Sequence, residues 1–185
     1  IGSEIAPHPV MKDPLFLNET LCISCHNATA VVTPELVSTF ETGDEWKAGK
    51  YAGEKNCISC HMDTITRHIA GQMGLRKSHR HWFAGSGIPK VKGTVSMALE
   101  GLAYKLSEVK KIYSTKEDLN FSLSLTNKNA GHRLPSGDPE RFYLIHLAII
   151  DKTTGKEVKK IQERIGEKWE WYPIAKKIDD NNLEI

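Results

Sequence analysis

Cys22-Ile23-Ser24-Cys25-His26 and Cys57-Ile58-Ser59-Cys60-His61 are two copies of one pentapeptide pattern, and they contain all four cysteines of the 185-residue chain. Cys-x-x-Cys-His is the attachment signature of a c-type haem, in which two thiols bind the porphyrin and the adjacent histidine ligates the iron. The sequence therefore predicts two haem c groups, each with its iron. Their expected attachment residues are Cys22, Cys25, Cys57 and Cys60, with His26 and His61 as iron ligands.

The spacing inside each motif suits this chemistry. One helical turn places both sulfurs on one edge of the macrocycle and directs the next residue under its centre. A four-thiolate zinc site or a pair of redox Cys-x-x-Cys motifs would not need a histidine after both cysteine pairs. The thirty-one residues between the pairs also exceed the usual zinc-ribbon separation of about 15–20. Haem attachment is therefore favoured over the zinc and thiol interpretations.

The charge of the chain argues against one class of partner. The formal charge is +2, and each ferric haem c with ionised propionates adds about −1, so the loaded protein is near neutral. Binding to nucleic acid through net charge is not expected. No apolar run approaches the roughly 18 residues that span a bilayer, so no transmembrane segment is expected. Because haem c is attached outside the energy-transducing membrane, we expect a periplasmic or extracellular protein whose signal peptide has been removed.

The sixth ligand of each iron must come from elsewhere, and His132 is the favoured candidate. Gly131 before it allows close backbone approach, and Pro135 after it stiffens the loop. The alternative is a structural loop histidine. Methionine ligation has no supporting pattern, and core filling is the default expectation for Met11, Met62, Met73 and Met97.

The basic segment around residues 76–85 is the next candidate. It offers His79 and His81, of which His81 is slightly favoured as a distal ligand. Arg76 and Arg80 could bind haem propionates, because guanidinium groups pair well with carboxylates. The alternative is a basic solvated loop.

Three histidines remain. His8 could fold back as a ligand or could meet another haem. His68 could serve a haem other than the one bound by His61. His146 lies inside a predicted strand, where a core or edge position is expected.

The pattern along the chain predicts an α+β fold with a domain boundary near residue 94. Residues 1–94 are expected to form a haem-wrapped dihaem domain of mostly short helices and irregular segments. Residues 95–185 are expected to form a small antiparallel, Ig-like β module that supplies a distal ligand. Fewer strands are visible than the about seven of a full sandwich, so the module is expected to be incomplete or completed by other sequence or a partner chain.

Individual elements follow from local signals. Helix starts are predicted at Thr33 to Val37, with Thr33 as N-cap and Pro34 in the first turn, and at Thr42 to Trp46. Residues 95–112 favour a helix followed by a strand, and alternation predicts strands near 119–125 and 142–150. Further strands are expected near 158–165 and 169–171. The run Asp179 to Asn182 predicts a solvated end.

The chain resembles bacterial and archaeal multihaem c-type cytochromes in which Cys-x-x-Cys-His segments precede a β-sandwich-like tail. The resemblance rests on the two motifs, on the segment from His79 to Gly85 and on the segment from Ala130 to Gly137. It implies that His132 and His81 are distal ligands. Relatives commonly carry more haems than two, so some histidines here could ligate haems in a neighbouring copy.

Electron transfer between redox proteins is the favoured function, with two bis-histidine, low-spin haems and no substrate pocket. A carrier is favoured over an enzyme. The alternative is a redox enzyme that acts on a small nitrogen or oxygen species at a five-coordinate haem. A third hypothesis is a subunit of a conductive assembly, with copies of itself or other cytochrome subunits as partners.

Overall fold

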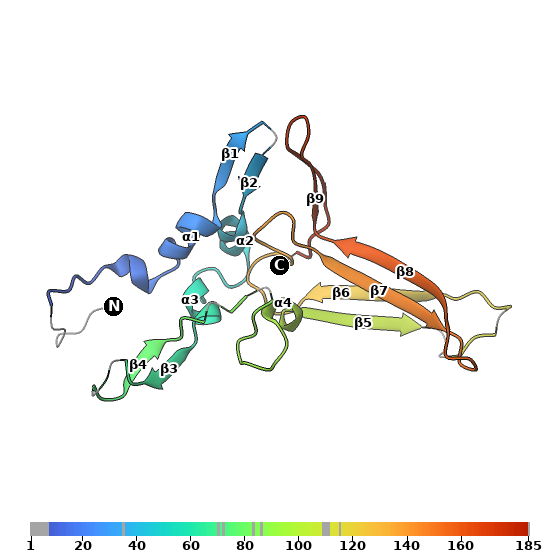
Figure 1. The fold of residues 1–185 in the computed structure, drawn as a ribbon, viewed down its shortest axis with the longest axis horizontal. Helices are drawn as coiled ribbons and strands as arrows, with labels where there is room; N and C mark the ends of the chain where they lie inside the picture. Colours follow the sequence, from blue (N-terminus) through green and yellow to red (C-terminus); the bar gives the residue numbers. More distant parts are fainter. Residues whose placement is uncertain are drawn as a thin grey trace.

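The computed structural model describes residues 8–34, 36–69, 71, 73–82, 84–85, 87–108, 112–114 and 116–184. Within these residues the chain is a small mixed α+β fold with short helices and five separate two-stranded antiparallel sheets (Figure 1). The helices are η1 (Pro14–Leu17), α1 (Thr20–His26), α2 (Thr42–Ala48), α3 (Cys57–His61) and α4 (Met97–Glu100). The α+β prediction is confirmed at this level.

Both Cys-x-x-Cys-His motifs are helical, on α1 and α3. A capping box starts α3: the Ser59 amide donates to Asn56 Oδ1 at 2.9 Å, and the Asn56 amide donates to Ser59 Oγ at 3.1 Å. Two amides that a helix start leaves without partners are satisfied in this way. The single helical turn expected for each motif is therefore present.

The N-terminal half contains two hairpins that were not predicted. Strand β1 (Thr29–Thr33) pairs with β2 (Leu36–Thr39), and β3 (Thr64–Arg67) pairs with β4 (Arg76–His79). The helix start predicted at Thr33 is wrong, because Thr33 ends a strand and Pro34 lies in the turn after it. Val31 and Val37 pair across β1 and β2, and such β-branched residues favour strands.

The C-terminal half follows the sequence pattern closely. Helix α4 is followed by strand β5, as expected for residues 95–112, and the helix predicted at Thr42 is α2. The remaining strands form hairpins in chain order, β5 with β6, β7 with β8, and β9 with β10. Their bounds are β5 (Leu102–Glu108), β6 (Phe121–Asn127), β7 (Tyr143–Ile150), β8 (Glu157–Ile165), β9 (Glu167–Glu170) and β10 (Lys176–Asp180). Figure 1 shows the β5–β6 and β7–β8 hairpins extending in the same direction from the centre of the molecule.

The run Asp179 to Asn182 is largely exposed, as predicted, but it also has specific partners in the fold. Asp179 and Asp180 belong to β10, and the Asp180 carboxylate bonds to Arg133. Asn181 accepts a hydrogen bond from the Gly166 amide at 2.8 Å. Local composition favoured solvation, but long-range partners give this segment a defined place in the fold.

The apolar core of the polypeptide is small. Among the described residues the buried hydrophobic side chains are Ala84 and Leu134. Many large apolar side chains are exposed, among them Leu75, Tyr104 and Val158 at 64%, 77% and 67%. In the described part of the chain, no helix is both long and apolar enough to span a membrane.

Candidate functional site

His61 and His132 face one another although they are far apart in sequence. His61 is the last residue of α3, and His132 lies in the loop after β6. Their ring centroids are 6.3 Å apart and their planes differ by 19°. The two residues come from the two predicted halves of the chain, so the fold brings these halves together at this point.

In both rings, Nδ1 is hydrogen-bonded to a backbone carbonyl. His61 Nδ1 bonds to the Ala84 carbonyl, and His132 Nδ1 bonds to the Arg133 carbonyl at 2.8 Å. A carbonyl oxygen only accepts, so each Nδ1 carries the proton and Nε2 keeps its lone pair. This is the tautomer of a histidine that binds a metal ion through Nε2.

The environment also favours the neutral form of both imidazoles. Burial lowers the pKa of His61, and the nearby His132, Lys90 and His26 lower it further. Burial likewise lowers the pKa of His132. Since only the neutral ring can donate a lone pair to a metal, the site favours the ligating form.

The distance between the ring centroids, 6.3 Å, is close to that of two imidazoles bound to one metal ion. Metal to imidazole bonds of about 2 Å on each side would place the two ring centroids about 6 Å apart. Among the described residues, no group of three or more His, Cys, Asp or Glu side chains is arranged to hold a metal ion. Two imidazoles alone leave four positions of an octahedral ion to other donors, and the four nitrogens of a porphyrin supply that number. The residues present therefore fit a haem iron with two histidine ligands.

The thiols of the two motifs also meet. Burial raises the pKa of Cys57 to about 11, and the hydrogen-bonded Cys22 thiol contributes to this shift. The effect of Cys22 on the Cys57 pKa shows that one cysteine of each motif lies near a cysteine of the other.

His26 has a different neighbour. Its ring meets Phe40 edge to face at a centroid distance of 6.4 Å. In the part of the chain that the structure describes, no second imidazole is paired with His26 as His132 is with His61. The two motifs are therefore unequal in their surroundings.

Close packing of α1 against α2 supports the His26 side of the site. A Cβ added to Gly43 would lie 2.8 Å from Asn27 Cβ and 3.0 Å from Ile23 Cγ2. The Asp44 amide donates to Asn27 Oδ1 at 2.9 Å. Gly43 is thus needed where the two helices touch.

The other candidate histidines lie outside this pair. Nδ1 of His8, His68 and His79 bonds to the carbonyls of Pro9, Met73 and Met62 at 3.0, 2.6 and 2.8 Å. All three rings are exposed, as are His81 and His146. The preference for His81 over His79 stays a prediction.

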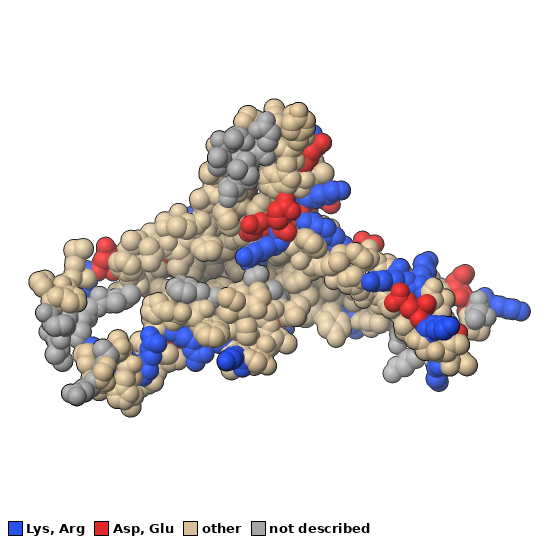
Figure 2. Space-filling view, viewed as in Figure 1, with Lys and Arg blue, Asp and Glu red and all other residues tan. Residues whose placement is uncertain are grey.

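The two candidate arginines lie on or next to the β3–β4 hairpin. Arg76 opens β4, and Arg80 donates from Nη1 to the Lys90 carbonyl at 3.2 Å. Neither described strand of this hairpin contains an acidic residue. Figure 2 shows blue side chains over this part of the molecule. Binding of propionates by these arginines stays a prediction.

Sequence reasoning missed the residues that support His132. Asn127, which is 8% exposed, donates from Nδ2 to the His132 carbonyl at 2.8 Å and accepts from the Ala130 amide at 3.0 Å. Gly131 was expected to allow a close approach, and a Cβ there would lie 3.3 Å from Tyr51 Cδ2. The position of Asn127 at the end of a predicted strand was the available signal, since such a residue often bonds to the loop that follows.

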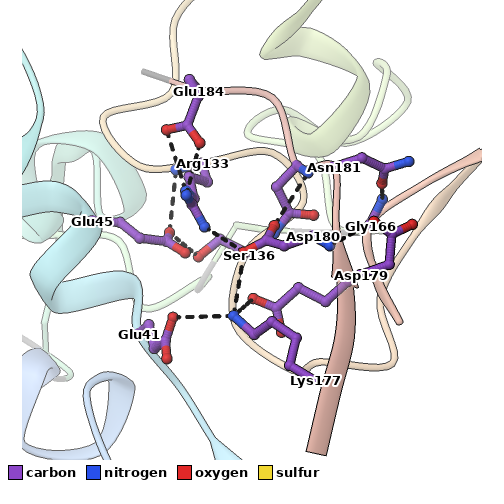
Figure 3. Close-up of polar contacts among 12 residues, drawn as sticks. Glu41, Glu45, Arg133, Ser136, Gly166, Lys177, Asp179, Asp180, Asn181 and Glu184 are labelled. Atoms are coloured by element: carbon purple, nitrogen blue, oxygen red, sulfur yellow. Dashed lines mark hydrogen bonds and ion pairs between the residues drawn. The ribbon is translucent and has the colours of Figure 1, made fainter. Parts of the chain in front are cut away.

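Helix α2 and the C-terminal segment hold the same loop through charged groups (Figure 3). Glu45 Oε2 accepts from the Arg133 amide at 3.2 Å and from Ser136 Oγ at 2.6 Å. Burial raises the pKa of Glu45, against the lowering effect of the Ser136 and Arg133 hydrogen bonds. The Arg133 guanidinium turns to the other side and bonds to Asp180 and Glu184.

Comparisons with protein families, with curated proteins and with solved structures found no match to the chain.

Proposed function

We propose that this chain is a dihaem c-type cytochrome that transfers single electrons. The observation that carries the proposal is the pairing of His61 with His132 at 6.3 Å, with both Nδ1 atoms bonded to carbonyls. His61 completes a Cys-x-x-Cys-His motif, which is specific for covalent haem. An accidental imidazole pair would not be expected to include the one residue that the motif assigns to iron.

Each side chain then has a defined task. Cys57 and Cys60 would attach one haem, and His61 and His132 would supply its two histidine ligands. Cys22 and Cys25 attach the other, with His26 as its proximal ligand. A bound haem supplies an iron that cycles between the ferric and ferrous states. The Ala84 and Arg133 carbonyls orient the two imidazoles.

The small apolar core supports a haem-wrapped fold. With Ala84 and Leu134 as the buried apolar residues among those described, the polypeptide has little to collapse on by itself. Two porphyrins are large apolar bodies that the exposed side chains could cover. The four strands from β5 to β8 then form the incomplete, Ig-like module whose loop supplies His132.

Two histidine ligands on one iron would favour electron transfer over catalysis at the His61 site, because they would leave no position for a substrate. We place the protein in the periplasm or outside the cell, where haem c is attached, with redox proteins as donor and acceptor. The basic residues of β3 and β4, Arg67, Arg76 and Lys77, suit an acidic partner surface.

A second function is favoured by the surroundings of His26. Phe40 rather than an imidazole lies against that ring. A haem there would be open to a small nitrogen or oxygen species unless another chain provides its sixth ligand. Carbon monoxide binding to the reduced protein separates these cases, because a six-coordinate haem binds it slowly or not at all.

The test is production in a host that matures c-type cytochromes, followed by intact-mass measurement and absorption spectroscopy. We expect a mass increase of two haems and a low-spin spectrum for the His61 site. The variant His132→Ala should make that site high-spin. A colourless protein with the mass of the bare chain, or one that contains zinc, would overturn the proposal.

A further inference from the structure

The C-terminal segment reaches back to the loop that carries His132. The Leu134 amide donates to the Leu183 carbonyl at 3.1 Å, and the Leu183 amide donates to the Leu134 carbonyl at 2.7 Å. Leu134 is one of the two buried apolar residues among those described, at 5% exposure. A backbone bridge therefore fixes the loop two residues after His132, at one of the few places where the chain has a packed interior.

Arg133 adds a second connection, next to His132 itself. Its Nη1 lies 2.8 Å from Asp180 Oδ2, and its Nη2 lies 2.7 Å from Glu184 Oε1. Nε also donates to the other oxygen of Glu184 at 3.3 Å, so the guanidinium binds that carboxylate with two nitrogens. Paired contacts of this kind fix direction as well as distance.

Lys177 extends the connection to other elements. Its Nζ lies 3.3 Å from Asp180 Oδ2, 2.7 Å from Glu167 Oε1 and 3.6 Å from Glu41 Oε2. Glu167 opens β9, and Glu41 directly precedes α2. Asp180 is thus held by two cations, and Figure 3 shows how these groups join the C-terminal segment to α2 and to the His132 loop.

From these contacts we infer that the segment from Lys177 to Glu184, acting through Arg133 and Leu134, is a clamp that positions His132 opposite His61. Arg133 is a positioning residue in this sense, since it acts through His132. The inference rests on the proposed function, because it concerns how a distal ligand is kept on its iron.

The physical argument concerns the effective concentration of the imidazole. A ligand on a rigid loop competes well with external ligands because its imidazole is held near the iron at a high effective concentration. Loosening the loop lowers that advantage without changing the imidazole. Loss of the clamp should therefore open the His61 site to external ligands while the proximal ligand and both thioether attachments remain.

The experiment uses the haem-loaded full-length protein with carbon monoxide as the probe. Arg133→Met removes the guanidinium but keeps an unbranched side chain, and Glu184→Gln is a milder change at an exposed residue. We expect both variants to bind more carbon monoxide per chain than the wild type, at a rate at least tenfold higher at the His61 site for Arg133→Met. Arg133→Lys, which keeps the charge, should restore part of the wild-type behaviour.

The matched control is Glu170→Gln. Glu170 pairs with Lys176 at 2.7 Å on the same β9–β10 hairpin, and its loss should leave carbon monoxide binding at the wild-type level. Circular dichroism and intact mass establish that each variant is folded and carries both haems.

The results distinguish the clamp from the proposed function. If His132→Ala opens the His61 site while Arg133→Met and Glu184→Gln behave as the wild type does, the clamp is refuted and the proposed function stands. If the wild-type protein carries no haem, or if His132→Ala leaves the site closed, the proposed function fails and the clamp fails with it.

Discussion

Gly131 lies so close to Tyr51 that a Cβ on Gly131 would sit 3.3 Å from Tyr51 Cδ2. The same Cβ would lie 3.4 Å from Trp46 Cδ1. Trp46 lies on α2 and Tyr51 in the turn after it, so the residue before His132 is packed against the segment that separates the two Cys-x-x-Cys-His motifs. The absence of a side chain at position 131 therefore helps to set the distance between His132 and His61.

Gly131→Val should displace the loop. Two methyl groups would push against Tyr51 and Trp46, and overpacking of this kind costs about 1–3 kcal/mol. We expect lower stability in urea and a partly high-spin spectrum at the His61 site. Gly74→Ala is the control, since nothing lies within 4 Å of a Cβ there. An unchanged spectrum in Gly131→Val would mean that this contact does not set the position of His132.

His132→Met should raise the reduction potential of one haem. Thioether ligation favours the ferrous state more than imidazole ligation does, and a rise on the order of 0.1 V lies well within the about 0.8 V that axial ligands span. Potentiometric titration followed by absorption measures it. His146→Met on β7 is the control because its ring is exposed and far along the hairpin. Equal potentials in His132→Met and the wild type would exclude His132 as an axial ligand.

Loss of one motif should reveal the difference between the two sites. In Cys22→Ser with Cys25→Ser, the remaining haem has both His61 and His132, and we expect little binding of carbon monoxide. In Cys57→Ser with Cys60→Ser, the remaining haem has His26 beside Phe40, and rapid binding is expected if no other chain supplies a ligand. Intact mass should give one haem in each variant. Similar binding in both variants would contradict the inequality of the two sites.

Asp180→Asn should lower stability at neutral pH and have no such effect in acid. Although burial alone raises the pKa of Asp180, the nearby Arg133 and Lys177 hold it below its usual range. A carboxylate with a lowered pKa stabilises the fold above its unfolded pKa of about 3.9, and this contribution is lost as the pH falls through the lower folded value. We expect a loss of about 1 kcal/mol at pH 7, the upper range for partly exposed pairs.

Urea unfolding of the haem-loaded protein at neutral and acid pH measures this difference. The matched control is Glu163→Gln, at an exposed position of β8, which should change stability little at either pH. A loss for Asp180→Asn that is as large in acid as at pH 7 would show that the carboxylate charge is not its cause.

Elements that depend on neighbouring residues could be predicted from the sequence. Thr42 with the acidic residues after it predicts α2, and the alternation around Leu147 predicts β7, because acidic residues in a first helical turn and half-buried strand faces are local signals. The helix predicted at Thr33 was wrong for a physical reason. Pro34 fits the first turn of a helix and also the turn of a hairpin, and the pairing of Val31 with Val37 decided between them.

The candidate site could be predicted only in part. His61 follows from its motif, and His132 follows from the stiffness of its loop. Their juxtaposition depends on contacts that no local pattern contains, such as Arg133 with Asp180. In sequence, Asp180 belongs to a polar run that resembles a solvated terminus. Its pairing with Arg133 and Lys177 depends on the fold and has no local sequence signal.

The closeness of the Cys22 and Cys57 thiols has a consequence for the rate of electron transfer between the two proposed haems. If each of these cysteines carried a haem as proposed, the two attachment points would lie close together. Electrons could then pass between the two groups without a long chain of intervening side chains. The pair would then behave toward outside reactants as one two-electron reservoir rather than as two isolated centres.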